Sequence, residues 1–303
     1  MKKGLISTEE ISIEQMEHLF ELADEIKQKK RINFLRNVVS VNIFFEPSTR
    51  TRLSFEGAIA LAGGNYIEIT EPSMSSKAKG ESFEDMIRMV ENYGHVIIIR
   101  HPEKGIAAKT LELAKIPVIN AGDGINEHPT QALQDIYTLR ESIGDINGIV
   151  LGVVGDLKYG RTVNSLIKAI SKYTIFKIYF ISSESLKISQ ELREYLISKN
   201  IVFIEVTSLE EVMARLDVLY VTRIQKERFA NYEEYEKEKD RYCISMDLVK
   251  KYGNGHMKIM HPLPRNNELS TDLDSYENSI YFQEAENGVY IRQALIGYLT
   301  GKL

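Results

Sequence analysis

Cysteine, tryptophan and long apolar runs are scarce in this chain. Its 303 residues include one cysteine, Cys243, and no tryptophan. A single thiol excludes an internal disulfide and any metal site built from several cysteines, and it fits a reducing compartment. No apolar run approaches the roughly 18 residues of a membrane span. The stretch MKKGLISTEEISIEQM turns acidic where a signal peptide would be apolar. We therefore expect a cytoplasmic protein that does not act at a membrane.

Basic residues are fewer than acidic residues. The chain has 38 lysines and arginines against 43 aspartates and glutamates, which gives a formal net charge of −5. This balance argues against a general nucleic-acid surface, so any cationic site must be local. The composition, 43% hydrophobic and 27% charged, is that of an ordinary soluble protein. The length suggests about two domains.

Short apolar runs separated by helix-like stretches indicate an α/β fold. Residues 14–30 place apolar side chains on one helical face. The apolar runs are VVSVNIFF, HVIIIR, IPVIN, IVLGVVGD, FKIYFIS, NIVFIEV, DVLYVTR and MKIM. Such strands, alternating with helices, are typical of parallel sheets covered on both faces. We predict two domains, each a mainly parallel sheet flanked by helices, on either side of a helix that begins near Thr130.

Polar and cationic side chains gather where the predicted strands end. Arg100 ends HVIIIR, Asn120 ends IPVIN, Asp156 ends IVLGVVGD and Arg223 ends DVLYVTR. Open α/β sheets bind their ligands at the carboxyl ends of the strands. Since these residues come from both predicted domains, we expect the active site to lie between the domains.

The motif STRTR places Arg50 and Arg52 in the first turn of a predicted helix capped by Ser48. The first turn exposes backbone N–H groups and the positive end of the macrodipole, so cations there are unfavourable unless an anion is bound. The amides, the hydroxyls of Ser48, Thr49 and Thr51, and the Arg50 guanidinium can enclose a phosphate. The alternative is a surface helix cap with two solvated arginines.

Two further helix starts carry candidate ligand-binding residues. Arg161 lies just inside a helix start in GVVGDLKYGRTVNSL and calls for a second anion. The glycines of that stretch do not form G-x-G-x-x-G, which disfavours nucleotide binding. In EHPTQ, His128 and Gln131 are three residues apart and can face one cavity, where His128 is a candidate donor to a polarised carbonyl. A metal site is disfavoured there because no second histidine follows one turn later.

Three loops complete the set of candidates. Arg223 and Gln225 are alternate residues in VTRIQKER and share one side if the strand continues. Two prolines in HPLPR fix the backbone, so the Leu263 carbonyl could accept a hydrogen bond from an amide; a rigid turn without a ligand is the alternative. The polar stretch SMSSKAKGES, which contains Lys79, is by composition a surface loop.

Taken in order, these motifs identify a family. The matching stretches are FFEPSTRTRLSFEGA, SMSSKAKGES, MVENYGHVIIIRHPEKG, NAGDGINEHPTQALQDIYTL, GVVGDLKYGRTVNSL, YVTRIQKER and MHPLPR. Along nearly the whole chain they resemble the aspartate/ornithine carbamoyltransferases, and within that family the branch that uses aspartate. The resemblance implies carbamoyl transfer from carbamoyl phosphate to L-aspartate, an early step of de novo pyrimidine biosynthesis, without a metal or other cofactor.

The resemblance also assigns roles to residues. Those implied for carbamoyl phosphate are Ser48, Thr49, Arg50, Thr51, Arg100, His128, Gln131, Leu263 and Pro264. Of these, Arg50, Thr51, Arg100 and His128 are the implied catalytic residues. The residues implied for aspartate are Lys79, Arg161, Arg223 and Gln225, with Ser75 and Lys79 supplied by a neighbouring subunit. The family further implies a homotrimer with shared active sites, possible regulatory chains and a cis Leu263–Pro264 bond.

By the same resemblance, residues 1–130 with 286–303 form the carbamoyl-phosphate-binding domain and residues 131–285 the aspartate-binding domain. The nearest rival is ornithine carbamoyltransferase, which carries His-Cys-Leu-Pro where this chain has His261-Pro262-Leu263-Pro264. Two arginines for the acceptor suit a dicarboxylate rather than a diamine. A non-catalytic anion-binding homologue is a second rival, and it predicts lost donor positions, of which we find none. Ala78, before Lys79, replaces a second lysine found in some relatives.

Overall fold

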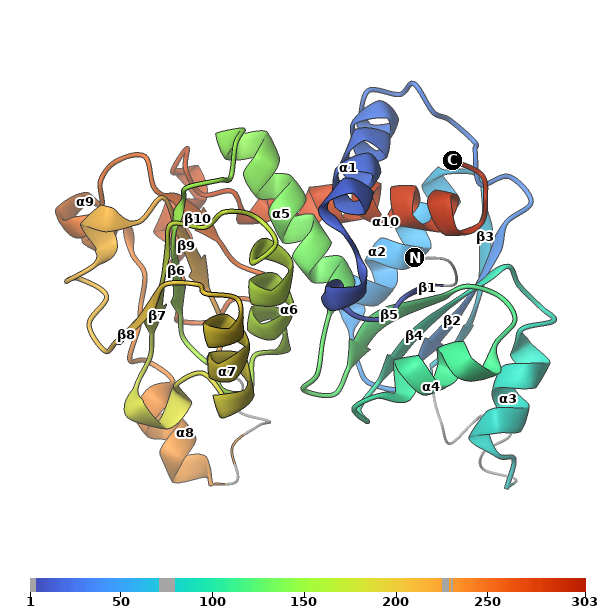
Figure 1. Ribbon diagram of the computed structural model, residues 1–303, viewed down its shortest axis with the longest axis horizontal. Coiled ribbons are helices and arrows are strands. Elements are labelled where there is room, and N and C mark those ends of the chain that lie inside the picture. The colour runs from blue at the N-terminus through green and yellow to red at the C-terminus, as the bar shows by residue number, and fades with distance from the viewer. Residues whose placement is uncertain (1–3, 71–79, 225–228, 230) are drawn as a thin grey trace. The chain divides into compact units, whose positions relative to one another are not determined.

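The computed structural model describes residues 4–70, 80–224, 229 and 231–303 (Figure 1). The chain divides into two compact units, Met1–Gln134 with Glu286–Leu303, and Asp135–Ala285. Among the described residues, each unit contains one five-stranded sheet in which all paired strands are parallel. The predicted fold class, two domains with parallel sheets flanked by helices, is confirmed.

The sheet of the first unit has the strand order β1-β5-β4-β2-β3. Its strands are β1 (Gly4–Leu5), β2 (Val39–Phe44), β3 (Asn65–Ile69), β4 (Val96–His101) and β5 (Val118–Asp123). Its helices are α1 (Ile13–Lys27), α2 (Thr49–Leu61), α3 (Phe83–Val90), α4 (Ile106–Leu113), the start of α5 (Pro129–Ile143) and most of α10 (Tyr281–Leu299). One core cluster joins apolar residues of β2 and β4 to α3 and α4.

Helix α10 is attached to α2 by polar contacts as well as by packing. The Arg292 guanidinium lies 5.0 Å from the centre of the Phe55 ring and donates a hydrogen bond to Ser54 Oγ at 2.9 Å. Gln293 Nε2 donates to the Ala58 carbonyl at 3.0 Å. The last helix thereby supports α2, the helix that begins with the STRTR motif.

The sheet of the second unit has the strand order β10-β9-β6-β7-β8. Its strands are β6 (Val150–Val154), β7 (Lys177–Ile181), β8 (Phe203–Val206), β9 (Val218–Val221) and β10 (Lys258–Met260). Its helices include α6 (Arg161–Ile170), α7 (Gln190–Ser198), α8 (Tyr232–Glu238) and α9 (Met246–Tyr252).

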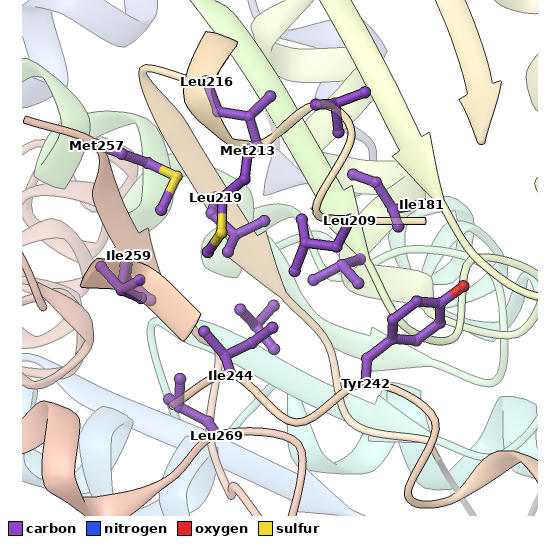
Figure 2. Packing of buried hydrophobic residues seen from close by; sticks show 14 of the residues in the cluster. Ile181, Leu209, Met213, Leu216, Leu219, Tyr242, Ile244, Met257, Ile259 and Leu269 are labelled. Carbon is purple, nitrogen blue, oxygen red and sulfur yellow. The ribbon is translucent and has the colours of Figure 1, made fainter. Parts of the chain in front are cut away.

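Figure 2 shows the apolar cluster that packs against β7, β9 and β10 of this unit. Its labelled members are Ile181, Leu209, Met213, Leu216, Leu219, Tyr242, Ile244, Met257, Ile259 and Leu269. Full burial of one such side chain contributes about 1.5–3 kcal/mol relative to exposure. The cluster therefore fixes β9 and β10, the strands that lead to Arg223 and Leu263.

Two strands and one boundary differ from the sequence-based expectation. β1 is only two residues long, and the first four residues of β3 are exposed, so neither has the apolar pattern of a buried strand. β5 continues past Asn120 to Asp123. None of the described helices is both long enough and apolar enough to cross a membrane.

Candidate active site

The STRTR motif lies at the junction between β2 and α2. Ser48 is the N-cap residue, as predicted, with φ −161° and ψ 101°. Its hydroxyl forms no hydrogen bond with the described first turn of α2. Thr49 and Arg50 are exposed and Thr51 is half-buried. The hydroxyls of three residues therefore lie at a helix end whose backbone N–H groups favour an anion.

The two arginines of this turn differ in their surroundings. Arg52 Nε lies 3.6 Å from Glu56 Oε1, and Arg52 Nη1 lies 3.6 Å from Glu68 Oε2. Burial, together with a hydrogen bond to Glu68, raises the pKa of Glu56. Arg52 thus faces carboxylates of its own chain, whereas Arg50 is exposed at the start of α2. Glu56, one turn after Arg52, is the sequence signal that distinguishes the two.

Arg100 is the penultimate residue of β4 and is buried, with 7% of its surface exposed. Its Nη1 donates to the Ala121 carbonyl at 3.3 Å, and its Nη2 lies 3.4 Å from Glu46 Oε2. One contact orients the guanidinium against β5, and the other holds it next to the loop that precedes STRTR. Arg100 is therefore a fixed cation beside the start of α2.

His128 and Gln131 lie at the start of α5 and are 4% and 6% exposed. His128 Nε2 lies 3.4 Å from Thr51 Oγ1, which links the start of α5 to the start of α2. The strands β5, β4 and β2 are neighbours in the sheet. This order brings the carboxyl ends of the three strands side by side, and the predicted residues lie at or after those ends, namely Ser48, Thr49, Arg50, Thr51, Arg100, His128 and Gln131.

A buried polar network shapes the loop before His128. Asn120 Nδ2 donates to Asp123 Oδ1 at 3.0 Å, and Asp123 Oδ1 accepts the Glu127 N–H at 3.2 Å. Glu127 in turn accepts hydrogen bonds from the N–H and hydroxyl of Thr8. From the sequence, Asn120 is expected to be a polar strand end. In the structure, Asn120 and its two acidic partners hold the loop in place.

In the second unit, the predicted residues again follow neighbouring strands, here β6, β9 and β10. Arg161 is the first residue of α6 and is buried, and Arg223 is half-buried two residues after β9. Leu263 and Pro264 follow β10 and are joined by a cis peptide bond, as the resemblance implied. Two cations and a fixed turn thus lie at the carboxyl edge of one sheet.

The His261–Glu268 pair beside this turn was not predicted from the sequence. His261 Nδ1 accepts the Leu263 N–H at 2.8 Å, and Nε2 lies 2.9 Å from Glu268 Oε1. Burial lowers the pKa of His261. Burial acts to raise the pKa of Glu268, but the hydrogen bonds from His261 and the Asn266 N–H outweigh it and lower that pKa. The sequence offers no signal for the pair. Residues 261 and 268 are seven apart, a helical spacing, but Pro262 and Pro264 between them rule out a helix that would bring the two side chains onto one face.

Three predicted site residues, Ser75, Lys79 and Gln225, lie outside the described residues. Within the described ranges, no group of three or more His, Cys, Asp and Glu side chains is arranged to hold a metal ion.

Comparisons with known proteins place both units in one family. The family model for the aspartate/ornithine carbamoyltransferase carbamoyl-P binding domain matches residues 3–141. The model for the aspartate/ornithine carbamoyltransferase Asp/Orn binding domain matches residues 147–299.

Similar proteins extend over nearly the whole chain. The aspartate carbamoyltransferase catalytic subunit of Clostridium botulinum (strain Langeland) is 44% identical over 302 residues, covering 99% of this chain and 98% of that protein. The catalytic subunit of Thermococcus gammatolerans is 44% identical over 305 residues, with the same coverage.

Two solved structures are closely similar. The catalytic subunit of M. jannaschii aspartate transcarbamoylase has a TM-score of 0.90 at 43% identity, covering 99% of this chain and 98% of that chain. Aspartate transcarbamoylase from Trypanosoma cruzi in complex with N-(phosphonacetyl)-L-aspartic acid has a TM-score of 0.90 at 34% identity, covering 97% and 95%.

Proposed function

This chain belongs to the aspartate/ornithine carbamoyltransferase family, and on that premise we propose that it is an enzyme that carbamoylates L-aspartate. It transfers the carbamoyl group of carbamoyl phosphate to the aspartate amine, giving N-carbamoyl-L-aspartate and phosphate. The observation that carries the proposal is the set of hydroxyls, buried Arg100 and buried His128 around the start of α2. We place the reaction at an early step of de novo pyrimidine biosynthesis.

The phosphate is bound at the start of α2. Ser48, Thr49, Arg50 and Thr51 hold its oxygens, and Arg100 binds it from the end of β4. The helix start supports this role because its N–H groups and macrodipole stabilise negative charge. Because Arg100 is buried and held in place, its charge can stabilise one position on the substrate.

Catalysis is positioning and electrostatic stabilisation. The aspartate amine attacks the carbamoyl carbon, and Thr51, Arg100 and His128 stabilise the negative charge that develops on the carbamoyl oxygen. The bond from the carbamoyl carbon to the phosphate oxygen then breaks, and the leaving phosphate takes the amine proton. Gln131 and the main-chain carbonyls of Leu263 and Pro264 bind the carbamoyl NH2. This path uses no covalent enzyme intermediate and no cofactor.

The acceptor site selects a dicarboxylate. Arg161, Arg223 and Gln225, with Lys79, bind the two carboxylates of L-aspartate. The positions of Arg161 and Arg223 after neighbouring strands of one sheet support this assignment. Ornithine carbamoyltransferase is the rival, but this chain has Pro262 in place of the cysteine of its late loop.

The assembly completes the proposal. Residues 1–130 with 286–303 bind carbamoyl phosphate, and residues 131–285 bind aspartate. Three identical chains form a cytoplasmic homotrimer in which Ser75 and Lys79 enter a neighbouring site. Regulatory chains are possible further partners. The name "catalytic subunit" carried by the similar proteins supports this.

The test is formation of ureido product from carbamoyl phosphate by the purified chain, run in parallel with L-aspartate and L-ornithine. We expect turnover with aspartate only. Turnover with ornithine would mean that the arginines have been misassigned. Inactivity with both acceptors would favour a non-catalytic homologue or an absolute need for a partner chain.

A further inference from the structure

The turn that carries Leu263 and Pro264 is held by a fully buried imidazole. His261 Nδ1 accepts the Leu263 N–H at 2.8 Å. On the other side of the ring, Nε2 lies 2.9 Å from Glu268 Oε1, and the same carboxylate oxygen accepts the Asn266 N–H at 2.9 Å. The backbone N–H of His261 donates to Glu284 Oε2, in the first turn of α10, at 3.1 Å. The turn is therefore anchored from two elements.

We propose that His261, oriented by Glu268, is a positioning residue for carbamoyl transfer. It fixes the backbone at Leu263 so that the carbonyls of Leu263 and Pro264 meet the carbamoyl NH2. The inference rests on the proposed function, which assigns those carbonyls to the substrate. His261 acts through the turn and not on the substrate, because its side chain has no exposed surface.

The hydrogen bonds fix the tautomer of His261. The Leu263 N–H can only donate, so Nδ1 must be an unprotonated acceptor. The ring proton is then on Nε2, where it donates to the Glu268 carboxylate. A carboxylate that accepts a hydrogen bond from one imidazole nitrogen leaves the other nitrogen unprotonated, and this is a common way to orient a histidine.

The backbone of Leu263 explains why such support is needed. Its φ is +52°, in the left-handed region that residues with a side chain rarely adopt. A hydrogen bond accepted from the Leu263 N–H holds that conformation in place. Protonation of Nδ1 would replace the acceptor by a second donor and break this bond.

The charges around the ring oppose that protonation. Burial lowers the pKa of His261, the charges of Arg265 and Arg223 lower it further, and only the contacts with Glu268 raise it. The neutral ring is therefore the stable form at neutral pH, and the turn keeps its acceptor. Glu268 helps to orient the ring, since its carboxylate accepts the hydrogen bond donated by Nε2.

The test separates the two ring nitrogens by substitution. In His261→Asn the amide oxygen can take the place of Nδ1 and accept the Leu263 N–H. In His261→Gln the amide nitrogen can take the place of Nε2 and donate to Glu268, but the acceptor is lost. His256→Asn is the matched control, because His256 is an exposed histidine five residues away, and its Nε2 lies 3.6 Å from Asp217 Oδ1.

We expect His261→Gln to lower kcat/KM for carbamoyl phosphate about 100-fold, the scale of a 1 Å misplacement, and His261→Asn to recover most of the loss. His256→Asn should match the wild type. Equal losses in the two His261 variants, in proportion to lost thermal stability, would mean that the ring only fills the core and would overturn the proposal.

Nitrogen NMR of the imidazole adds a readout independent of turnover. In the wild type we expect a neutral ring protonated at Nε2, and Glu268→Met, which removes the acceptor of that proton, should weaken this preference. A ring protonated at Nδ1 would overturn the inference while leaving the proposed function standing. A wild-type chain that forms no ureido product either alone or assembled with regulatory chains would overturn the proposed function, and this inference with it.

Discussion

Two arginines in one helical turn have different environments, and this difference can be tested residue by residue. Arg52 is held by Glu56 and Glu68 at 3.6 Å each, whereas Arg50 is exposed at the helix start. We expect Arg50→Ala to lower kcat by about 10²- to 10³-fold, the usual cost of removing a donor that stabilises developing charge. Steady-state kinetics with both substrates measures it.

Arg52→Ala is the matched control in the same turn. It removes ion pairs with partly exposed side chains, which typically contribute up to about 1 kcal/mol to stability. We therefore expect a small fall in melting temperature and a kcat close to that of the wild type. If Arg52→Ala abolished activity and Arg50→Ala did not, the assignment of the phosphate ligand would be reversed.

Glu56, in the same cluster, should make the stability of the fold depend on pH. Its pKa is raised above the usual 4.5 by burial first and by Glu68 second, so the folded state binds its proton more tightly than the unfolded state does. Stability from this group is then present below pH 4.5 and is lost as pH rises through the folded-state pKa. We expect Glu56→Gln to gain stability relative to the wild type near pH 7, but not near pH 4, in urea unfolding.

The exposed carboxyl of Glu112 provides the control for that comparison. Glu112→Gln should shift the unfolding midpoint little at either pH. A Glu56→Gln variant that lost the same stability at both pH values would show that its hydrogen bonds, and not its charge, dominate.

At the scale of elements, the sequence predicted the strands that are apolar throughout and missed those that are not. β3 is an edge strand with an exposed surface, and β1 is too short to show a period. For the site, the sequence predicted the residues at the ends of buried strands, because polar residues that come directly after an apolar run mark the start of a loop. It missed Glu268, which acts through a contact with His261 that no local period encodes.

Gly155 follows β6 directly and lies against the backbone at the end of β9. Its φ is +117°, and a Cβ there would lie 2.3 Å from the Thr222 carbonyl oxygen, next to Arg223. Gly155→Ala must therefore displace the end of β9. We expect the KM for aspartate to rise by about 10-fold or more, since small misplacements of a binding group are costly.

Gly144→Ala separates displacement from backbone strain. Gly144 also has a positive φ, +85°, but a Cβ there meets nothing within 4 Å. It should lose about 1–2 kcal/mol of stability through strain alone and keep its KM for aspartate. An unchanged KM in Gly155→Ala would argue that the end of β9 does not position an aspartate ligand.

At the scale of the whole molecule, the order of strands within each sheet determines which distant residues meet. In the first unit β5, β4 and β2 are neighbours, and in the second β10, β9 and β6 are neighbours. Chain order does not reveal this, because every parallel connection can pass to either side of a strand already placed. The family resemblance supplied what local patterns could not.

The proposed homotrimer leads to a prediction about mixtures of inactive chains. If each active site takes Arg50 from one chain and Lys79 from its neighbour, Arg50→Ala and Lys79→Ala should each be nearly inactive. After the two are mixed, dissociated and reassembled at random, about a quarter of the sites combine an intact Arg50 with an intact Lys79. We expect carbamoyltransferase activity to return to about that fraction of the wild type.

The double variant Arg50→Ala, Lys79→Ala mixed equally with the wild type is the control. Separate trimers give half of the wild-type activity, and random reassembly should reduce it to about a quarter, because a site needs two intact neighbours. Activity that stays at half after reassembly, together with no recovery from the two single variants, would show that each chain completes its own site. Lys79 would then act within its own subunit, and the need for a trimer would have to lie in stability and not in chemistry.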